Sequence, residues 1–385
     1  MRSTRKKTVT AALAFVLTLS TLVAGQVPAV AAPGMRARSA MTVNDVRLVQ
    51  LVGTVITNMR TGVPPSAPAG VWSNDGESAC FRCDAGLALA MAAAAAAAGN
   101  RVQRGIAEQI FDHDITAYQQ TNGSFGTTPN GSDLETMFFT VELGTAAILL
   151  KPDQTPERHA RWVSSVASAA DFLIRNGNLS WYTNGNIAIG NALVMALAAR
   201  VTGNALYTAQ YRAAITFATA PPQDRWPGFG FIYTDPSVRP DGLDGKGYFT
   251  EGAADAIPGF DAEYTMLQID FLARLYVINR EPVVLRMLNM VTNELMPRVN
   301  TTTWRLNTSG GSRHPQMNRE FPFDTAALAV LANLGNRPYM QRFVPSQTAA
   351  YIKAFKGDDG ERLRYAVGMT TASVLMSQPG SAGMR

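Results

Sequence analysis

The stretch "LAARVTGNALYTAQYRAAI" at residues 197–215 decides the fold class. In it, a segment rich in Ala and Leu ends at Gly203 and Asn204, and a more polar segment with apolar residues at helical spacing begins at once. Gly is typical of a helix C-terminus and Asn of a helix N-cap, so the stretch predicts two helices joined by a tight turn. A connection this short forces the two helices into an antiparallel hairpin.

The same pattern recurs at three other places along the chain, where the breaks fall at Asn100, Asn279 and Asn336. The first helix of each pair is rich in small apolar residues, as in a tightly packed inner layer, and the second carries the polar stripe of an outer layer. Helical periodicity predicts twelve helices in all. They lie near residues 41–61, 82–98, 102–121, 132–150, 156–176, 186–202, 204–218, 261–279, 281–297, 324–334, 337–355 and 359–377. Hairpins that cannot bury their apolar faces alone stack on one another, so six of them predict an all-α, (α/α)6-type toroid of helical hairpins with long rim loops.

The N-terminal residues 1–31 predict a secretory signal peptide. Four basic residues lie within the first seven positions, an apolar run covers residues 8–25, and Ala29 and Ala31 supply the small residues of a cleavage site. No later segment has the roughly 20 consecutive apolar residues that a membrane span needs. We therefore expect residues 32–385 to form a single secreted toroid domain that is monomeric and does not bind the membrane after cleavage.

Charge and cysteine content narrow the classes of function. The chain has a net charge of +5, but four of these charges lie in the predicted signal peptide, so we expect no nucleic-acid partner. The two cysteines, Cys80 and Cys83, have C-x-x-C spacing. A zinc site would need two further ligands, and a second C-x-x-C is absent from the sequence. Export instead favours a Cys80–Cys83 disulfide, and no metal site is predicted.

The long connections between hairpins gather on one side, because the turns within hairpins are short. They cover residues 64–81, 122–131, 177–185, 219–260 and 298–323. The most unusual connection contains "DGLDGKGYFTEGAADAIPGFDAEYT" (residues 241–265), with five glycines and six acidic residues. In a helical toroid the long connections form a rim over a concave site, so we expect this segment to be an active-site rim.

Six helical hairpins, a signal peptide and the segment "DGKGYFTEGAADAIPGFDAEY" (residues 244–264) resemble the (α/α) toroid polysaccharide-degrading enzymes. That superfamily includes chondroitin, hyaluronate and alginate lyases and six-hairpin glycosidases. Lyases of the chondroitin type carry a "DGSF-x-QH…Y-x-G-x-YG" segment. Here Glu251 stands near the place of its histidine, and Phe260 with Asp261 near the place of its final tyrosine. The resemblance implies a toroid enzyme that cleaves the glycosidic bonds of a polysaccharide or oligosaccharide.

Cleavage by β-elimination is the first prediction. A lyase must neutralise a uronate carboxylate, remove the C5 proton and protonate the leaving oxygen, and the chain offers Asn, Arg, Tyr and His side chains for these steps. The predicted catalytic residues are Tyr248, Glu251, His314, Asn186, Arg239, Asp255 and Asp261. Tyr248 and Glu251 are expected to point together into the funnel after a bend at Gly247 or Gly252. Sugar faces stack on aromatic rings and sugar hydroxyls bind polar groups, so further rim residues are predicted to bind substrate. They are Trp181, Trp226, Phe229, Tyr233, Asn184 and Arg313.

Two alternatives stay open. A glycoside hydrolase would need only two carboxylates beside the bond. Residues 224–263 carry eight acidic and three basic residues, a surplus that would repel a polyanion and favours a neutral glycan. No cofactor is predicted. The alternative is a calcium ion bound by this acidic loop. Asp261 would otherwise serve only as an N-cap of the 261–279 helix. The second alternative is a toroid that binds glycans through its aromatic rings without catalysis.

Overall fold

The computed structural model describes residues 70, 81–182, 184–224, 228–236, 245–252, 258–313, 315–316, 320–323 and 326–335. All of them belong to one compact unit of the chain. The predicted signal peptide and the predicted helices at 41–61, 337–355 and 359–377 lie outside the described residues.

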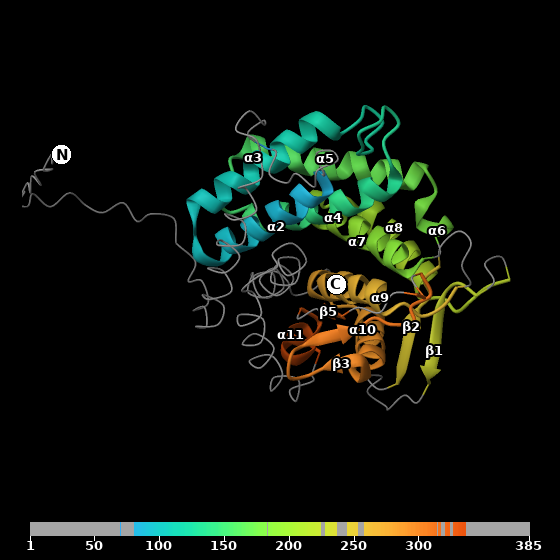
Figure 1. The fold of residues 1–385 in the computed structure, drawn as a ribbon. Coiled ribbons are helices and arrows are strands. Elements are labelled where there is room, and N and C mark those ends of the chain that lie inside the picture. Colours follow the sequence, from blue (N-terminus) through green and yellow to red (C-terminus); the bar gives the residue numbers. More distant parts are fainter. Residues whose placement is uncertain are drawn as a thin grey trace, which may run out of the picture. The chain divides into compact units, whose positions relative to one another are not determined.

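Nine of the predicted helices are confirmed, and a tenth helix is very short (Figure 1). The helices are α2 (Phe81–Ala98), α3 (Arg101–Tyr118), α4 (Asp133–Leu150), α5 (Pro156–Arg175), α6 (Asn178–Trp181), α7 (Gly185–Thr202), α8 (Ala205–Ala218), α9 (Ala262–Asn279), α10 (Pro282–Leu295) and α11 (Ala326–Asn333). Asn100 and Asn204 cap α3 and α8, because each side chain accepts a hydrogen bond from a backbone N–H of the first turn. Asn279 is instead the last residue of α9, and Arg280 follows it in the left-handed conformation, at φ 56°.

The helices form the predicted two layers. α2, α4, α7, α9 and α11 each contact the next of the series, whereas α3, α5, α8 and α10 each pack on the preceding inner helix (Figure 1). The inner helix α7 is apolar and long enough to cross a membrane by composition, yet 15 of its 18 residues are buried among the other elements. This is the pattern of a core helix. Because each outer helix returns antiparallel to its partner, the inner helices begin at one common end of the fold.

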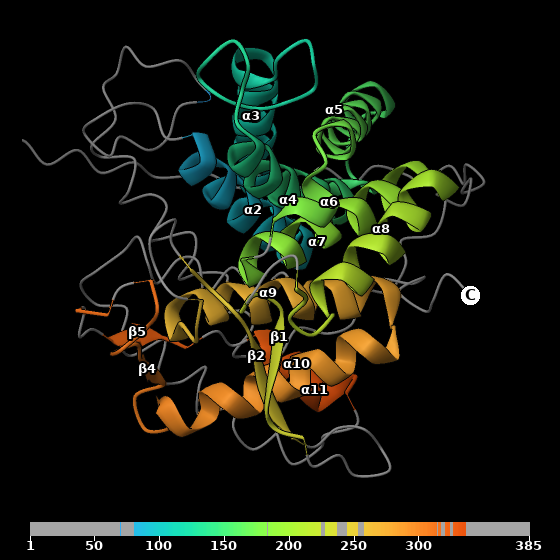
Figure 2. The same cartoon turned by 90° about the vertical axis from the view of Figure 1, so that its right-hand side faces the viewer.

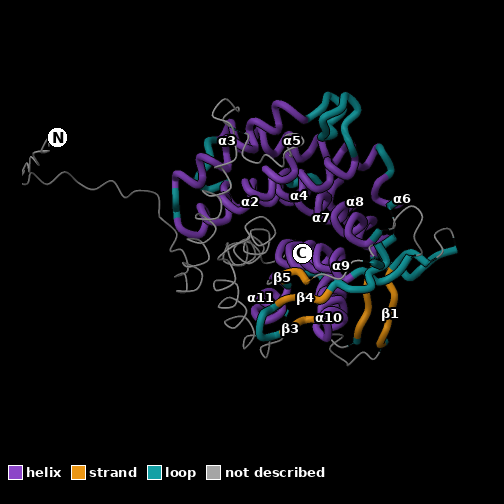
Figure 3. The backbone as a smooth tube through the Cα atoms, in the orientation of Figure 1, coloured by secondary structure: helices purple, strands orange, loops and turns teal. Residues whose placement is uncertain are grey.

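Short strands occupy two of the long connections, where the sequence predicted only loops. β1 (Phe231–Asp235) pairs antiparallel with β2 (Lys246–Phe249), and β3 (Val299–Asn300), β4 (Arg305–Asn307) and β5 (Glu320–Pro322) form a second antiparallel sheet. All the described strands follow α8 in the chain. Figure 3 shows them in orange. β2 packs against α10 (Figure 2). Runs of two to five residues are too short for alternation to be distinguished from a loop.

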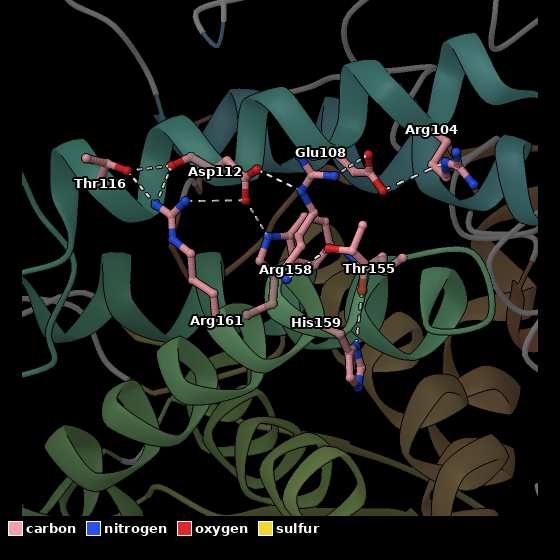
Figure 4. A network of polar contacts seen from close by, with 10 residues as sticks. Arg104, Glu108, Asp112, Thr116, Thr155, Arg158, His159 and Arg161 are labelled. Atoms are coloured by element: carbon pink, nitrogen blue, oxygen red, sulfur yellow. Dashed lines mark hydrogen bonds and ion pairs between the residues drawn. The ribbon is translucent and has the colours of Figure 1, made fainter.

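Polar contacts join the outer helices α3 and α5 (Figure 4). Arg158 donates to Glu108 Oε2 at 2.8 Å and to Asp112 Oδ2 at 2.9 Å, and Trp162 Nε1 donates to Asp112 Oδ1 at 2.8 Å. Such partly exposed ion pairs each contribute little free energy, but the shared Asp112 sets how α5 lies on α3.

Candidate active site

Four segments meet where α7 and α9 begin. Gly185 N–H donates to the Thr250 carbonyl at 3.0 Å, which joins the start of α7 to the end of β2. Asn184 and Gly252 exchange two further hydrogen bonds, with Asn184 Nδ2 donating to the Gly252 carbonyl at 2.9 Å and Gly252 N–H to Asn184 Oδ1 at 3.3 Å. Ser312 Oγ donates to the Glu251 carbonyl at 2.7 Å and brings in the loop after β4. These contacts surround the side chain of Glu251.

Glu251 is completely buried, so the prediction that it points into an open funnel is wrong. Its Oε1 accepts hydrogen bonds from Asn186 N–H at 2.7 Å and from Gln268 Nε2 at 2.8 Å. Among the described residues no group donates to its Oε2, and Arg313 Nη1 lies 3.9 Å from that atom. Burial raises the pKa of Glu251 to about 8, although the two hydrogen bonds and Arg313 oppose the shift. The carboxyl group is therefore protonated at neutral pH.

Arg313 contacts the same carboxyl group from the loop after β4. Its backbone N–H donates to Asp261 Oδ2 at 3.0 Å, and its guanidinium carbon lies 4.3 Å from the centre of the Tyr264 ring. The side chain is 24% exposed, and its buried Nε has no hydrogen-bond partner. Apart from the long contact to Glu251, no described side chain accepts from this guanidinium. It therefore keeps donors that a ligand could use.

Asp261 is an N-cap, as the alternative reading of its role predicted. Oδ1 accepts from the backbone N–H groups of Glu263 and Tyr264, both at 3.1 Å. Oδ2 accepts from Arg313 N–H, and the side chain is buried. These bonds occupy the carboxylate, so a role for Asp261 in proton transfer is not supported. Asp261 instead holds α9 and Arg313 together.

Tyr248 does not accompany Glu251. It lies on β2 opposite Ile232, and its ring meets the edge of Phe260 with ring centres 5.2 Å apart. Burial raises its pKa, and Glu294 of α10 adds to the shift. No contact in the described part of the chain joins Tyr248 to Glu251, so the bend that was expected to unite them is not found.

The predicted substrate-binding aromatics also separate. Trp181 is 55% exposed and its ring centre lies 4.7 Å from that of Tyr182, whose hydroxyl donates to Asp133 Oδ2 at 2.8 Å. This pair immediately precedes Asn184 and the start of α7. Tyr233 instead belongs to the β1–β2 hairpin, where its hydroxyl accepts from Arg286 of α10 at 3.0 Å. Phe229 lines a small apolar pocket beside Phe249 and Tyr182.

Some of the predicted residues cannot be placed at this site. His314, Arg239, Asp255, Trp226 and Cys80 lie outside the described residues, and so does the side chain of Cys83. Asn186 is buried, contributes its backbone N–H to Glu251, and has no partner for its Oδ1. Sequence reasoning missed Tyr264 and Gln268. Both lie on the face of α9 that turns toward Glu251, three and seven residues after the N-cap Asp261. This helical spacing could have shown from the sequence that they share a face.

No protein-family model and no curated protein matches the sequence. Among solved structures, a family 76 glycoside hydrolase from a bovine Bacteroides thetaiotaomicron strain is similar at 10% identity, with a TM-score of 0.55 over 87% of this chain and 78% of that chain. A D-mannose isomerase is similar at 11% identity, with a TM-score of 0.57 over 88% of this chain and 100% of that one. A polysaccharide lyase is similar at 10% identity, with a TM-score of 0.55 over 86% and 97% of the two chains.

The chain has the (α/α) toroid fold. The predicted toroid fold is thereby confirmed, and at about 10% identity these similarities concern the fold alone. The neighbours named above are a hydrolase, an isomerase and a lyase, so the fold alone does not decide the reaction of this chain.

The described part of the toroid contains a second completely buried acid, on the outer helix α3. Asp114, near the end of α3, has Oδ1 at 3.0 Å from His113 Nδ1, while its Oδ2 has no hydrogen-bond partner among the described residues. Burial raises the pKa of Asp114 to about 9, and the negative charge of Asp84 in the first turn of α2 adds to the shift. No group of three or more His, Cys, Asp and Glu side chains arranged to hold a metal ion occurs among the described residues.

Proposed function

We propose that the chain is a secreted enzyme that cleaves the glycosidic bonds of an acidic polysaccharide by β-elimination. The observation that carries the proposal is the guanidinium of Arg313, which is partly exposed, stacked on Tyr264 and without a close acceptor among the described side chains. The toroid fold, shared with a polysaccharide lyase and a glycoside hydrolase, supports the same class of substrate.

The protonation of Glu251 makes Arg313 suitable for an anionic ligand. With a pKa of about 8, Glu251 is mostly neutral at pH 7, and Glu251 is the one described acidic side chain within 4 Å of the Arg313 guanidinium. A planar guanidinium binds a carboxylate through two parallel hydrogen bonds, and these are strong because both partners are charged. A uronate bound in this way would have its carboxylate charge neutralised, which stabilises the carbanion that forms when the C5 proton leaves.

Neighbouring groups fit the other needs of an elimination. Tyr264 contacts Arg313 through its ring and carries a titratable hydroxyl; burial raises its pKa and the charge of Arg313 opposes that shift. We assign Tyr264 as the first candidate for proton transfer and keep His314, the next residue after Arg313, as the second. The exposed ring of Trp181 offers a flat surface on which a sugar could stack.

Hydrolysis is the second candidate, and the pKa of Glu251 favours it. A carboxyl group that stays protonated at neutral pH is what a glycosidase uses as general acid. Glu251 could serve in this way only if the segments around it moved apart, because both its oxygens are buried. Elimination through Arg313 needs no such movement.

A matched pair of polymers tests the proposal. The purified protein is incubated with a panel of uronate-containing polysaccharides and with the carboxyl-reduced form of each, and both ultraviolet absorbance and new reducing ends are recorded. Elimination creates an unsaturated uronate that absorbs, and it requires the carboxylate. We expect absorbance and reducing ends to rise together on an acidic polymer and neither to rise on its reduced form. Reducing ends without absorbance would establish hydrolysis instead.

A further inference from the structure

Glu251 and Arg313 face each other but do not form a hydrogen bond. Oε2 of Glu251 and Nη1 of Arg313 are 3.9 Å apart, about 1 Å longer than a charge-assisted hydrogen bond. Both Oε2 of Glu251 and Nε of Arg313 are buried, and neither has a hydrogen-bond partner in the part of the chain that the structure describes. Buried polar atoms are rarely left unpaired. Here two of them lie on neighbouring side chains that can carry opposite charges, which suggests that the two side chains have a second conformation in which they pair.

We propose that Glu251 is a positioning residue whose charge decides whether Arg313 is available to the ligand. When the Glu251 carboxyl is neutral, the guanidinium stays over Tyr264 and can bind an anionic group of a sugar. When the carboxyl is ionised, it draws the guanidinium across the gap and closes an ion pair. The anionic class of ligand rests on the proposed function, whereas the movement rests on the contacts of Glu251 and Arg313 themselves.

The surroundings of Glu251 support this reading. From α7 it receives only the N–H of Asn186, and from α9 only the neutral amide of Gln268. Two other titratable groups face it from α9: Asp261, whose carboxylate accepts three backbone N–H groups, and Tyr264, whose pKa is raised by burial. Arg313 is thus the only cation among the described groups that act on Glu251. An ionised Glu251 has no other described positive charge to pair with.

The mechanism predicts a loss of affinity at alkaline pH. Below a pH of about 8 Glu251 is protonated and Arg313 is free. Above it, ligand binding must first break the Glu251–Arg313 pair, so the dissociation constant of an anionic sugar should rise by up to about tenfold per pH unit. The effect should fall on KM more than on kcat, because the Glu251–Arg313 pair competes with ligand binding and is already broken in the bound complex.

The test measures binding of glucuronate to the full chain by calorimetry at pH values of about 6 to about 9.5, with glucose as the neutral control. Glu251→Gln keeps the shape and remains neutral at every pH. Glu320→Gln is the matched control, because Glu320 forms an exposed pair with Arg305 at 3.3 Å, away from the Glu251–Arg313 contact. We expect wild type and Glu320→Gln to lose glucuronate affinity above a pH of about 8, and Glu251→Gln to keep it.

An unchanged alkaline loss in Glu251→Gln would overturn the inference, and so would a wild-type protein that does not bind glucuronate at the lower pH. If Glu251→Gln does not fold, Arg313→Gln provides the second test. This variant should bind glucuronate weakly at every pH, and a wild-type alkaline loss in it would again overturn the inference. Failure of the proposed function is separate. Glucuronate binding with this pH dependence, but without elimination on any polymer, would reject the reaction and leave the role of Glu251 intact.

Discussion

Glu251 and Asp114 are two completely buried carboxyl groups with different surroundings. Glu251 receives two hydrogen bonds on one oxygen and has Arg313 at 3.9 Å from the other. Within the described part of the chain, Asp114 has one polar contact, to His113, and the acidic Asp84 is the charged group that acts on it. Burial raises both pKa values, to about 8 and about 9, but a cation opposes the first shift while an acid adds to the second.

Because of this difference, Glu251 can change its charge state in the folded protein, whereas Asp114 cannot. Ionised Glu251 would find a guanidinium within a small side-chain movement, so both of its charge states are accessible to the folded protein. Ionised Asp114 would face a second negative charge in a buried site, which is strongly unfavourable. We therefore read Asp114 as a neutral structural group of the α2–α3 hairpin and Glu251 as part of the site.

Stability against pH should show the largest effect. Both folded-state pKa values lie above the ordinary values of 4.5 and 3.8, so the folded chain holds protons that the unfolded chain has released. Each group therefore contributes stability fully below its ordinary pKa, and this contribution is lost as pH rises to about 8 for Glu251 and to about 9 for Asp114. The loss is on the order of 1 kcal/mol per pH unit and group.

Denaturant unfolding at a series of pH values measures this loss. In Glu251→Gln the unfolding free energy should fall less steeply with pH up to a pH of about 8. In Asp114→Asn it should fall less steeply up to a pH of about 9. Glu320→Gln, which changes an exposed acid, should follow the wild type. If the unfolding free energy of both variants falls with pH as steeply as that of the wild type, these two carboxyl groups are not protonated in the folded protein.

Activity should separate the two carboxyl sites next. Arg313→Gln removes the cation beside Glu251, and we expect kcat/KM on the acidic polysaccharide to fall by on the order of 100-fold. Asp114→Asn should stay close to the wild-type rate. Initial rates from the absorbance of the unsaturated product measure both. Equal losses in the two variants would mean that the Arg313 effect is one of general stability.

A pair of glycines tests how tightly each carboxyl site is packed. A Cβ at Gly185 would lie 2.2 Å from Phe249 Cβ and 2.8 Å from Gln268 Nε2, the donor to Glu251. Gly185→Ala should therefore cost about 1–3 kcal/mol and reduce activity. Gly86, two residues after Asp84 in α2, has open space around a Cβ. Gly86→Ala should instead stabilise by about 0.5–1 kcal/mol in thermal or denaturant unfolding. A stable, active Gly185→Ala variant would contradict the described packing.

The exposed pair Glu320–Arg305 provides the smallest effect. Its carboxylate side chain is 57% exposed, and the two atoms are 3.3 Å apart. Replacing Glu320 by Gln should change the unfolding free energy by less than about 1 kcal/mol, and added salt should reduce that difference. A larger change would indicate that this sheet contributes more to stability than its exposure suggests.

The helices could be predicted because their signals are local. The Asn204 cap and Pro156 at the first position of α5 each act within one helical turn, and α7 is a continuous run dominated by small and apolar residues. The strands could not be predicted in the same way. β2 exists because β1 pairs with it and α10 packs against it, and neither partner can be read from its four residues.

The candidate site was likewise predictable only in part. Glu251, Arg313, Asn184 and Asn186 could be named from the sequence, since charged and amide side chains in Gly-rich connections stand out. Their roles could not. Burial makes Glu251 a neutral neighbour of Arg313, and the start of α9 makes Asp261 a cap. Tyr248 and Glu251, three residues apart, contact different elements.

The sequence by itself determined the helical hairpins, their order, and hence the toroid, because hydrophobic periodicity, caps and short turns act between neighbours in the chain. Only the tertiary structure decided which polar groups share one site. Glu251, Gln268 and Arg313 come from segments up to 62 positions apart, and their contacts depend on how α7, α9 and two loops pack. The charge of Glu251 was decided there too, because desolvation depends on everything that surrounds a carboxyl group, and sequence neighbours are a small part of that.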